Sequence, residues 1–358
     1  MNADATPRWA AFAKAHPVCD MLGLNLTHPR FAIDHIDLGV LDPSTFRGDF
    51  AKFADWGLDL VMCKGGPVLY DDNFAALWPR QPEWRPGRPD AERLYLSPAF
   101  KNPTQVVLSL LDRFLCDVEA NPDKVRLVRR KADLEADGRI GLLMGSNRAD
   151  WFGDAPGVLR MFARLGLRMI TISVSGRDPG WDGHDILRGG GAGLSEMGVR
   201  LIQEMNRCGI LIDMAHSNEA SALDIIEVSE VPVVDTHSNP LALSVQKRED
   251  STRDTSDAVM RALAASGGLL GLIPAISRPP GEKPYAGVDA KELAGALRTI
   301  DYAVDLMGID HVGIGTHFNT ACLPWLLEAV LDAGYAEADA AKIFGGNYRR
   351  VLHRVLPD

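Results

Sequence analysis

Three histidines each come directly after a short apolar run of the sequence. The runs and their histidines are 210–215 with His216, 231–236 with His237, and 311–316 with His317. Neutral imidazole nitrogens bind divalent transition metals, zinc in particular, and three such ligands leave the fourth tetrahedral position open for water. The pattern therefore predicts one zinc ion on these three histidines, if the fold brings the ends of the three runs together. His311 begins its run instead of ending it, so we expect it at the opposite end of the strand.

Eight short apolar runs can supply the elements that position these residues. They are Val18–Leu22, Leu58–Cys63, Ile140–Gly145, Leu167–Val174, Ile210–Ala215, Val231–Thr236, Gly268–Pro274 and His311–Thr316. Most are continuously apolar, which is typical of strands buried on both faces of a parallel sheet. Helical patterns lie between several of them, with Ser217-Asn218 as a predicted N-cap. Glycines stand where helices give way to strands, at Gly57, Gly166, Gly209, Gly267 and Gly308.

Eight strand–helix units predict the α/β class and a (β/α)8 TIM barrel, which we expect to be a single domain over residues 1–358. A doubly wound open sheet is the alternative, but no glycine-rich phosphate loop follows the first strand. Residues 65–103 are too long for an ordinary connection and carry Trp78, Trp84 and Tyr95. We interpret this stretch as a lid over the site.

Composition excludes several classes of protein. The chain has 358 residues with 38 basic and 48 acidic side chains, a net charge of −10, which disfavours nucleic-acid binding. No apolar run approaches the roughly 18 residues of a membrane span. The first 15 residues lack the apolar core of a secretory signal, and the five scattered cysteines favour reduced thiols. We therefore expect a cytoplasmic protein with neither a membrane nor a nucleic acid as partner.

Several segments together resemble the renal (membrane) dipeptidase family, peptidase family M19. They are Gly193-Leu194-Ser195, Asn206-Arg207, Ile212-Asp213-Met214-Ala215-His216-Ser217, Asp235-Thr236-His237-Ser238-Asn239 and Arg253-Asp254-Thr255-Ser256-Asp257. The resemblance implies a (β/α)8 barrel with a two-zinc centre that hydrolyses small dipeptides, and a homodimer. It makes His216 and His237 ligands of one zinc. It also makes Arg253 the residue that binds the substrate carboxylate, which suits a planar guanidinium.

The sequence departs from that family at the second metal position. Leu22 and Leu24 stand where the family has two ligands on its first strand, and we place Met144 where it has a bridging glutamate. His317 stands where the family has an aspartate. Leucine cannot coordinate zinc and a thioether cannot replace a bridging carboxylate, so one metal position has lost its ligands.

Three functions therefore stay open. The first is a dipeptidase-like hydrolase of a small amide or dipeptide with one zinc. The second is a metal-free barrel enzyme, a lyase or isomerase, that acts on a small carboxylate through His237, Asp235 and Arg253. The third is a binding protein without turnover. The candidate catalytic residues are Asp20, Asp235 and His317, with Asp20 and Asp235 as possible general bases. The candidate substrate-binding residues are Arg253, Asn147 and Trp181.

Overall fold

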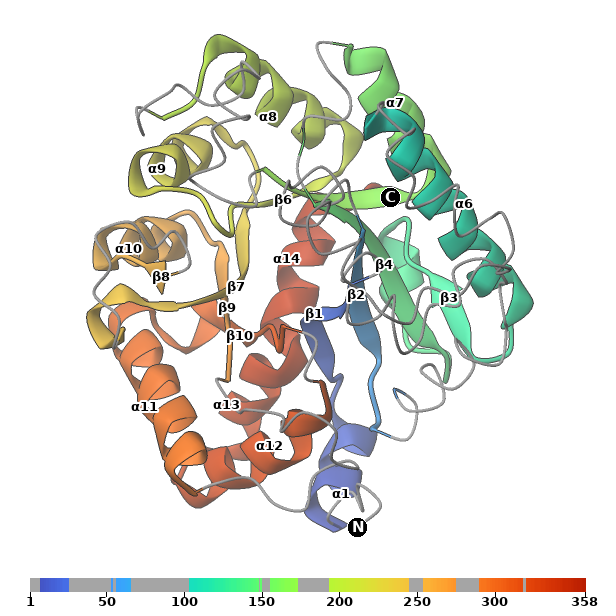
Figure 1. The fold of residues 1–358 in the computed structure, drawn as a ribbon. Helices are drawn as coiled ribbons and strands as arrows, with labels where there is room; N and C mark the ends of the chain where they lie inside the picture. The colour runs from blue at the N-terminus through green and yellow to red at the C-terminus, as the bar shows by residue number, and fades with distance from the viewer. Residues whose placement is uncertain are drawn as a thin grey trace, which may run out of the picture.

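A parallel sheet closes almost completely into a barrel, with helices around its outside, in a computed structural model of the chain (Figure 1). The structure describes residues 7–25, 53, 56–65, 103–147, 149, 155–172, 193–244, 254–274, 290–317 and 320–358. The α/β barrel predicted from the eight apolar runs is confirmed. The predicted lid, between Gly65 and Pro103, lies outside the described residues.

Eight strands form the barrel, and each pairs in parallel with the next. In barrel order they are β1 (Cys19–Asn25), β2 (Leu60–Gly65), β4 (Ile140–Asn147), β5 (Leu167–Thr171), β6 (Leu211–Asp213), β7 (Val234–Pro240), β9 (Leu269–Leu272) and β10 (Val312–Ile314). Each of them overlaps one predicted run. Two short strands, β3 (Val125–Leu127) and β8 (Asp254–Thr255), lie off this path and pair with β4 and β7.

Helices cover the outer face of the barrel in Figure 1. They are α1 (Pro7–Ala15), α6 (Pro103–Ala120), α7 (Pro156–Leu165), α8 (Glu196–Cys208), α9 (Glu219–Val228), α10 (Asp257–Ala265), α11 (Ala290–Met307), α12 (Leu323–Asp332) and α13 (Glu337–Ala341). Helix α14 (Asn347–Val355) lies apart from them, across one end of the barrel. Short helical turns span Lys131–Leu134, Leu241–Leu243, Ile309–His311, Thr320–Cys322 and Lys342–Gly346. Among the described helices, none is long and apolar enough to cross a bilayer.

The predicted helix ends are present. The Asn218 side chain accepts a hydrogen bond from the Ser221 backbone N–H and so caps α9. Gly166 and Gly209 follow α7 and α8 with φ of 113° and 62°, a region that glycine enters without a Cβ penalty. Asn218 thus marks where α9 begins, and Gly166 and Gly209 mark where α7 and α8 stop before the next strand.

The core has two layers. The larger one fills the space between the strands and the surrounding helices, while the second fills the barrel interior with side chains such as Met62, Leu143 and Met169. Residues of α14, including Tyr348 and Leu352, belong to the interior layer. Helix α14 therefore closes the base of the barrel, the end where the strands begin.

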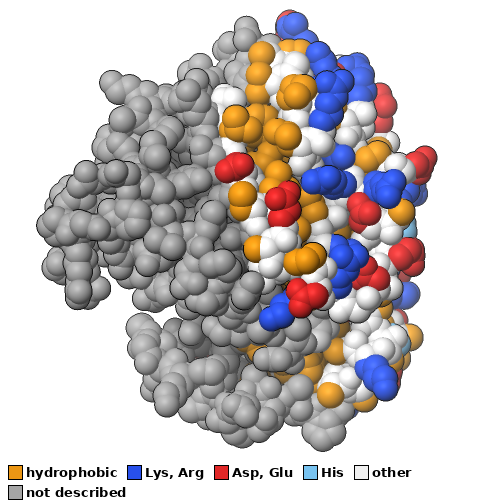
Figure 2. Space-filling view, turned by 90° about the vertical axis from the view of Figure 1, so that its right-hand side faces the viewer, with side chains coloured by type: hydrophobic (Ala, Val, Ile, Leu, Met, Phe, Trp, Pro, Cys, Tyr) orange, Lys and Arg blue, Asp and Glu red, His pale blue; other side chains and the backbone are white. Residues whose placement is uncertain are grey.

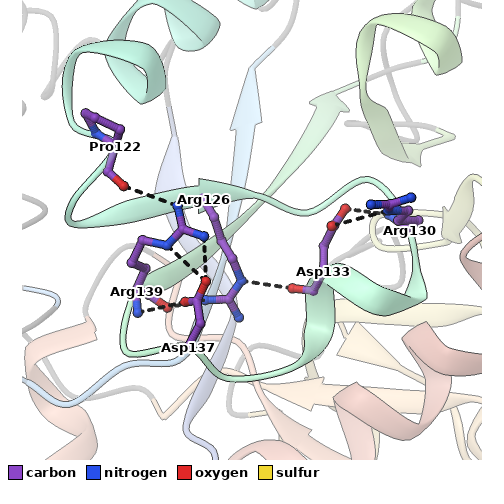
Figure 3. Close-up of polar contacts among 6 residues, drawn as sticks. All are labelled: Pro122, Arg126, Arg130, Asp133, Asp137 and Arg139. Atoms are coloured by element: carbon purple, nitrogen blue, oxygen red, sulfur yellow. Dashed lines mark hydrogen bonds and ion pairs between the residues drawn. The ribbon is translucent and has the colours of Figure 1, made fainter.

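Polar clamps hold that base together, as Figure 3 shows for the segment around β3. Arg126 donates to the backbone carbonyls of Asp133 and Arg139 and pairs with the Asp137 carboxylate. Arg139 pairs with the same carboxylate and donates to the Pro122 carbonyl. The outer surface near α6 mixes hydrophobic and charged side chains (Figure 2).

Candidate functional site

The three histidines lie at the opposite end of the barrel, where the strands finish. His237 lies within β7, while His216 and His317 each follow the last residue of their strand by three positions. His216 has φ of 67° and His317 has φ of 53°, and they are the two non-glycine residues with positive φ in the part of the chain that the structure describes. Such backbone is uncommon outside glycine and concentrates at functional sites.

Their imidazole rings converge. The Nε2 atoms of His216 and His237 are 2.9 Å apart, and the two ring centroids are separated by 4.9 Å. The His317 ring lies 5.3 Å from that of His237, at an interplanar angle of 30°. The structure thus brings together the three rings that the sequence singled out.

A buried aspartate organises the segments that carry two of these rings. One oxygen of Asp213, Oδ1, accepts backbone hydrogen bonds from Ala215 at 3.1 Å and Thr236 at 2.9 Å. The other, Oδ2, accepts the hydroxyls of Thr171 at 2.6 Å and Thr236 at 2.8 Å. The Thr236 hydroxyl also lies 2.7 Å from Nδ1 of His237. Asp213 therefore fixes the turn before His216 and, through Thr236, the His237 ring.

A lysine completes this cluster from β2. Lys64 is 2% exposed, and its Nζ lies 3.4 Å from Oδ2 of Asp213. Burial lowers the pKa of Lys64, while the carboxylates of Asp213 and Asp235 act in the opposite direction. Neither Lys64 nor Asp213 is among the site residues predicted from the sequence. The signal was present, because each lies at or next to the end of a mainly apolar strand, where a charged side chain is expensive to bury without a partner.

Asp235 lies beside the cluster and faces β8. Its Oδ2 accepts the Thr255 hydroxyl at 2.7 Å, while its Oδ1 has no hydrogen-bond partner among the described residues. Burial and the nearby charge of Asp213 raise the pKa of Asp235 to about 7, although the Thr255 hydrogen bond opposes them. A carboxyl group that titrates near neutral pH can exchange protons, which suits the predicted role as general base.

Asp20, the other predicted base, has a different environment. Its carboxylate is fully buried and accepts hydrogen bonds from the backbone of Leu22 and from the backbone and hydroxyl of Thr316. The Thr320 hydroxyl donates to it as well, at 2.7 Å. Burial raises the pKa of Asp20, against these hydrogen bonds. The contacts tie β1 to the end of β10, so this geometry favours closing the barrel and holding the segment before His317.

Of the three predicted substrate-binding residues, the structure describes one. Asn147 ends β4 and is 5% exposed. Arg253 and Trp181 lie outside the described residues. Leu22 packs in the barrel interior.

The orientation of β4 corrects one assignment. Met144 belongs to the outer core layer, between strands and helices, whereas Leu143 belongs to the barrel interior. Successive strand residues point to opposite faces, so Met144 cannot stand where a metal-bridging side chain would project. Leu143 faces the interior instead. Ile140–Asn147 contains no carboxylate, so the conclusion that no carboxylate bridges from this strand is unchanged.

The fit of this site to zinc is partial. The two facing Nε2 atoms are suitable donors, and their 2.9 Å separation is short for two nitrogens that share a tetrahedral ion at about 2.0–2.1 Å each. Among the described residues, no group of three or more histidine, cysteine, aspartate or glutamate side chains is arranged to hold a metal ion.

Comparison with known proteins identifies the family. The family model for membrane dipeptidase, peptidase family M19, matches residues 74–356. The chain belongs to this family. Among curated relatives, it is 26% identical over 252 residues to "Dipeptidase verJ" of Clonostachys rogersoniana and 29% identical over 226 residues to "Dipeptidase aclJ" of Aspergillus oryzae. These matches span 66% and 60% of this chain but only 62% and 51% of those proteins.

Two solved structures share the fold. The probable dipeptidase PvdM from Pseudomonas aeruginosa has a TM-score of 0.72 at 19% identity, covering 99% of both chains. A metallo peptidase from Rhodobacter sphaeroides, liganded with a phosphinate mimic of the dipeptide L-Ala-D-Ala, has a TM-score of 0.66 at 25% identity. That match covers 95% of this chain and 99% of that one. The predicted M19 resemblance is confirmed.

Proposed function

We propose that this M19 protein is a dipeptidase-like hydrolase of a small amide or dipeptide. The observation that carries the proposal is the pair of facing Nε2 atoms, 2.9 Å apart, on the strand-end rim of the barrel. Strand-end rims are where barrels of this kind carry their chemistry. The dipeptide mimic bound to the Rhodobacter sphaeroides relative supports the substrate class.

The roles follow from the residue chemistry. His216 and His237 would hold one zinc ion, with His317 as the third ligand if its ring moves toward the pair. A bound zinc ion supplies a Lewis acid and an acidified water molecule. Asp235 would accept the proton of the attacking water and return it to the leaving amine. Asn147, Trp181 and Arg253 would contact the substrate, with Arg253 on its carboxylate.

A metal-free enzyme is the second candidate, and a specific observation favours it. The 2.9 Å separation of the two Nε2 atoms is that of a hydrogen bond. In this reading one imidazole donates to the other, and His237 acts as acid or base on a small carboxylate. The same residues serve both candidates, so the metal requirement separates them.

The test starts from protein purified without chelators. Zinc per chain is measured by elemental analysis, and hydrolysis is measured on a dipeptide panel that includes C-terminal D-residues. The proposal expects near-stoichiometric zinc, loss of hydrolysis on chelation and recovery on adding zinc back. Hydrolysis that survives exhaustive chelation would leave the metal-free candidate. Binding of dipeptides without turnover would contradict the hydrolase and favour a binding protein.

We also propose a cytoplasmic homodimer, on the family resemblance and the composition. Light scattering on a gel-filtration column gives the oligomeric state directly. A monomeric mass at micromolar concentration would contradict the dimer.

A further inference from the structure

The buried lysine of β2 has no role in the chemistry described so far. Lys64 lies inside the barrel at 2% exposure, one residue from the end of its strand, with its Nζ 3.4 Å from Asp213. Lysine is almost never fully buried without a partner. A buried ion pair is also a poor source of stability, since desolvation offsets the attraction. The pair therefore calls for another explanation.

The hydrogen-bond partners around Asp213 fix the direction of each proton. As an ionised carboxylate, Asp213 only accepts, and five donors approach it from Thr171, Ala215, Thr236 and Lys64. The Thr236 hydroxyl has one proton. When that proton goes to Oδ2 of Asp213, the hydroxyl can only accept from Nδ1 of His237.

We propose that Lys64, Asp213 and Thr236 form a buried relay that keeps the His237 proton on Nδ1 and turns its Nε2 lone pair toward His216. The inference rests on the proposed function for its purpose, because a free Nε2 is what either a zinc ion or a catalytic base requires. The three residues are positioning residues. None of them is required to touch the substrate.

Lys64 sets the direction of the hydrogen bonds in the relay. Its Nζ donates to Oδ2 of Asp213, the same oxygen that accepts the Thr236 hydroxyl proton. Without that donor, a proton on Asp213 would be donated to Thr236, whose hydroxyl would then donate to Nδ1 of His237. The His237 proton would move to Nε2. In the serine-protease triad, an aspartate-to-asparagine change has the same effect on tautomer and lowers kcat about 10⁴-fold.

The first experiment uses two variants of one residue. Thr236→Ser keeps the hydroxyl, and Thr236→Val replaces it with a methyl group of the same shape. Protein labelled with ¹⁵N-histidine, treated with chelator, reports the protonation of each imidazole nitrogen by NMR, with His237 assigned from its loss in His237→Gln. Wild type and Thr236→Ser should carry the proton on Nδ1, and Thr236→Val should lose that preference. Its kcat should fall about 10–100-fold, with KM little changed.

A second experiment reverses the relay without leaving a charge unpaired. In Lys64→Met/Asp213→Asn, the backbone N–H groups of Ala215 and Thr236 hold the amide oxygen where Oδ1 is now. The amide NH₂ then faces Thr236 and donates to its hydroxyl. The His237 proton should therefore appear on Nε2. The double variant should fold better than Lys64→Met alone, since it buries no lone carboxylate.

Two results would overturn the relay. One is an unchanged His237 tautomer in both Thr236→Val and the double variant. The other is an equal loss of kcat in Thr236→Ser and Thr236→Val. Because the tautomer is read without substrate, it decides the relay even if no dipeptide is hydrolysed. The absence of hydrolysis by wild type would count against the proposed function alone.

Discussion

The two ends of the barrel solve the problem of buried charge in different ways. At the base, Arg168 is 8% exposed and its guanidinium donates to the backbone carbonyls of Arg129, Ala163 and Leu167. At the mouth, the end of the barrel where the strands finish, Oδ1 of Asp235 has no hydrogen-bond partner among the described residues. At the base, Arg168 joins segments of backbone. At the mouth, the buried charges of Lys64 and Asp213 pair with each other.

The two ends of the barrel also differ in which residues adopt positive φ. The positive φ values of His216 and His317 both occur at the mouth. At the base, positive φ falls on glycines such as Gly166 and Gly209, where it ends helices without strain. Strained and incompletely bonded groups persist only where a packed scaffold holds them, and they cluster at functional sites. The difference indicates that stability is built at the base and chemistry at the mouth.

Replacing one histidine at each end should give the largest contrast. His216→Ala removes one of the two facing nitrogens and should lower kcat/KM about 10²–10⁴-fold, the range of a lost acid–base or ligand group. His311→Ala is the matched control at the base, where Nδ1 of His311 contacts the Gly268 carbonyl. It should leave kcat/KM within about twofold, since it touches no mouth residue. Steady-state kinetics on a dipeptide substrate measure both.

Comparable losses of kcat/KM in the two variants would contradict the assignment of the chemistry to the mouth. A folded state confirmed by circular dichroism is needed for each, so that a loss of kcat is not read from unfolded protein.

Removing the Arg168 guanidinium from the base of the barrel should affect stability alone. Arg168→Met keeps much of the side-chain volume but leaves three buried carbonyls without their donor. The cost should be about 2–4 kcal/mol of unfolding free energy, from unsatisfied buried acceptors. The fraction that remains folded should keep its kcat. Urea unfolding and kinetics at the same temperature measure the two quantities, and a kcat that falls as far as that of His216→Ala would contradict the division.

The sequence was sufficient for the strands and for the convergence of the histidine rings, for a physical reason. Strands buried on both faces are continuously apolar, and the carboxyl ends of parallel strands meet at one edge. His216, His237 and His317 could therefore be placed together without any knowledge of side-chain contacts. Helix caps at Asn218 and Gly209 were equally local.

Two features could not be predicted from the sequence: which way a strand side chain points, and which distant residues form hydrogen bonds with it. Met144 and Leu143 are adjacent and both apolar, so only the pleat of β4 shows that Leu143 faces inward. Asp20 was predicted as a base, yet its four hydrogen bonds come largely from residues some 300 positions away. The pairing of Lys64 with Asp213 joins β2 to β6 across 149 residues. Such long-range contacts leave no local pattern.

The mouth should respond to pH in the neutral range. Because burial raises the pKa of Asp235 to about 7, the folded protein holds a proton that the unfolded chain releases near pH 4. The unfolding free energy should therefore fall as pH rises from about 4 to 7. Asp235→Asn has no such charge. Its unfolding free energy relative to that of wild type should therefore rise by about 1–3 kcal/mol between pH 5 and pH 8. Thermal unfolding of chelator-treated protein measures this difference, and a gap that is constant with pH would contradict it.

The base should respond to pH weakly, and in the acid range. The ion pair with Arg139 holds the pKa of Asp137 near 2, below the usual value, so its contribution is complete above about pH 4 and is lost as pH falls toward 2. The Asp137 side chain is 39% exposed, and solvent screening limits the contribution to about 0.5–1 kcal/mol. Asp137→Asn should thus lower the unfolding free energy by less than Arg168→Met does at pH 6, and its deficit should shrink by pH 3. A deficit larger than that of Arg168→Met would mean that ion pairs, and not the bonds from arginine to backbone carbonyls, hold the base together.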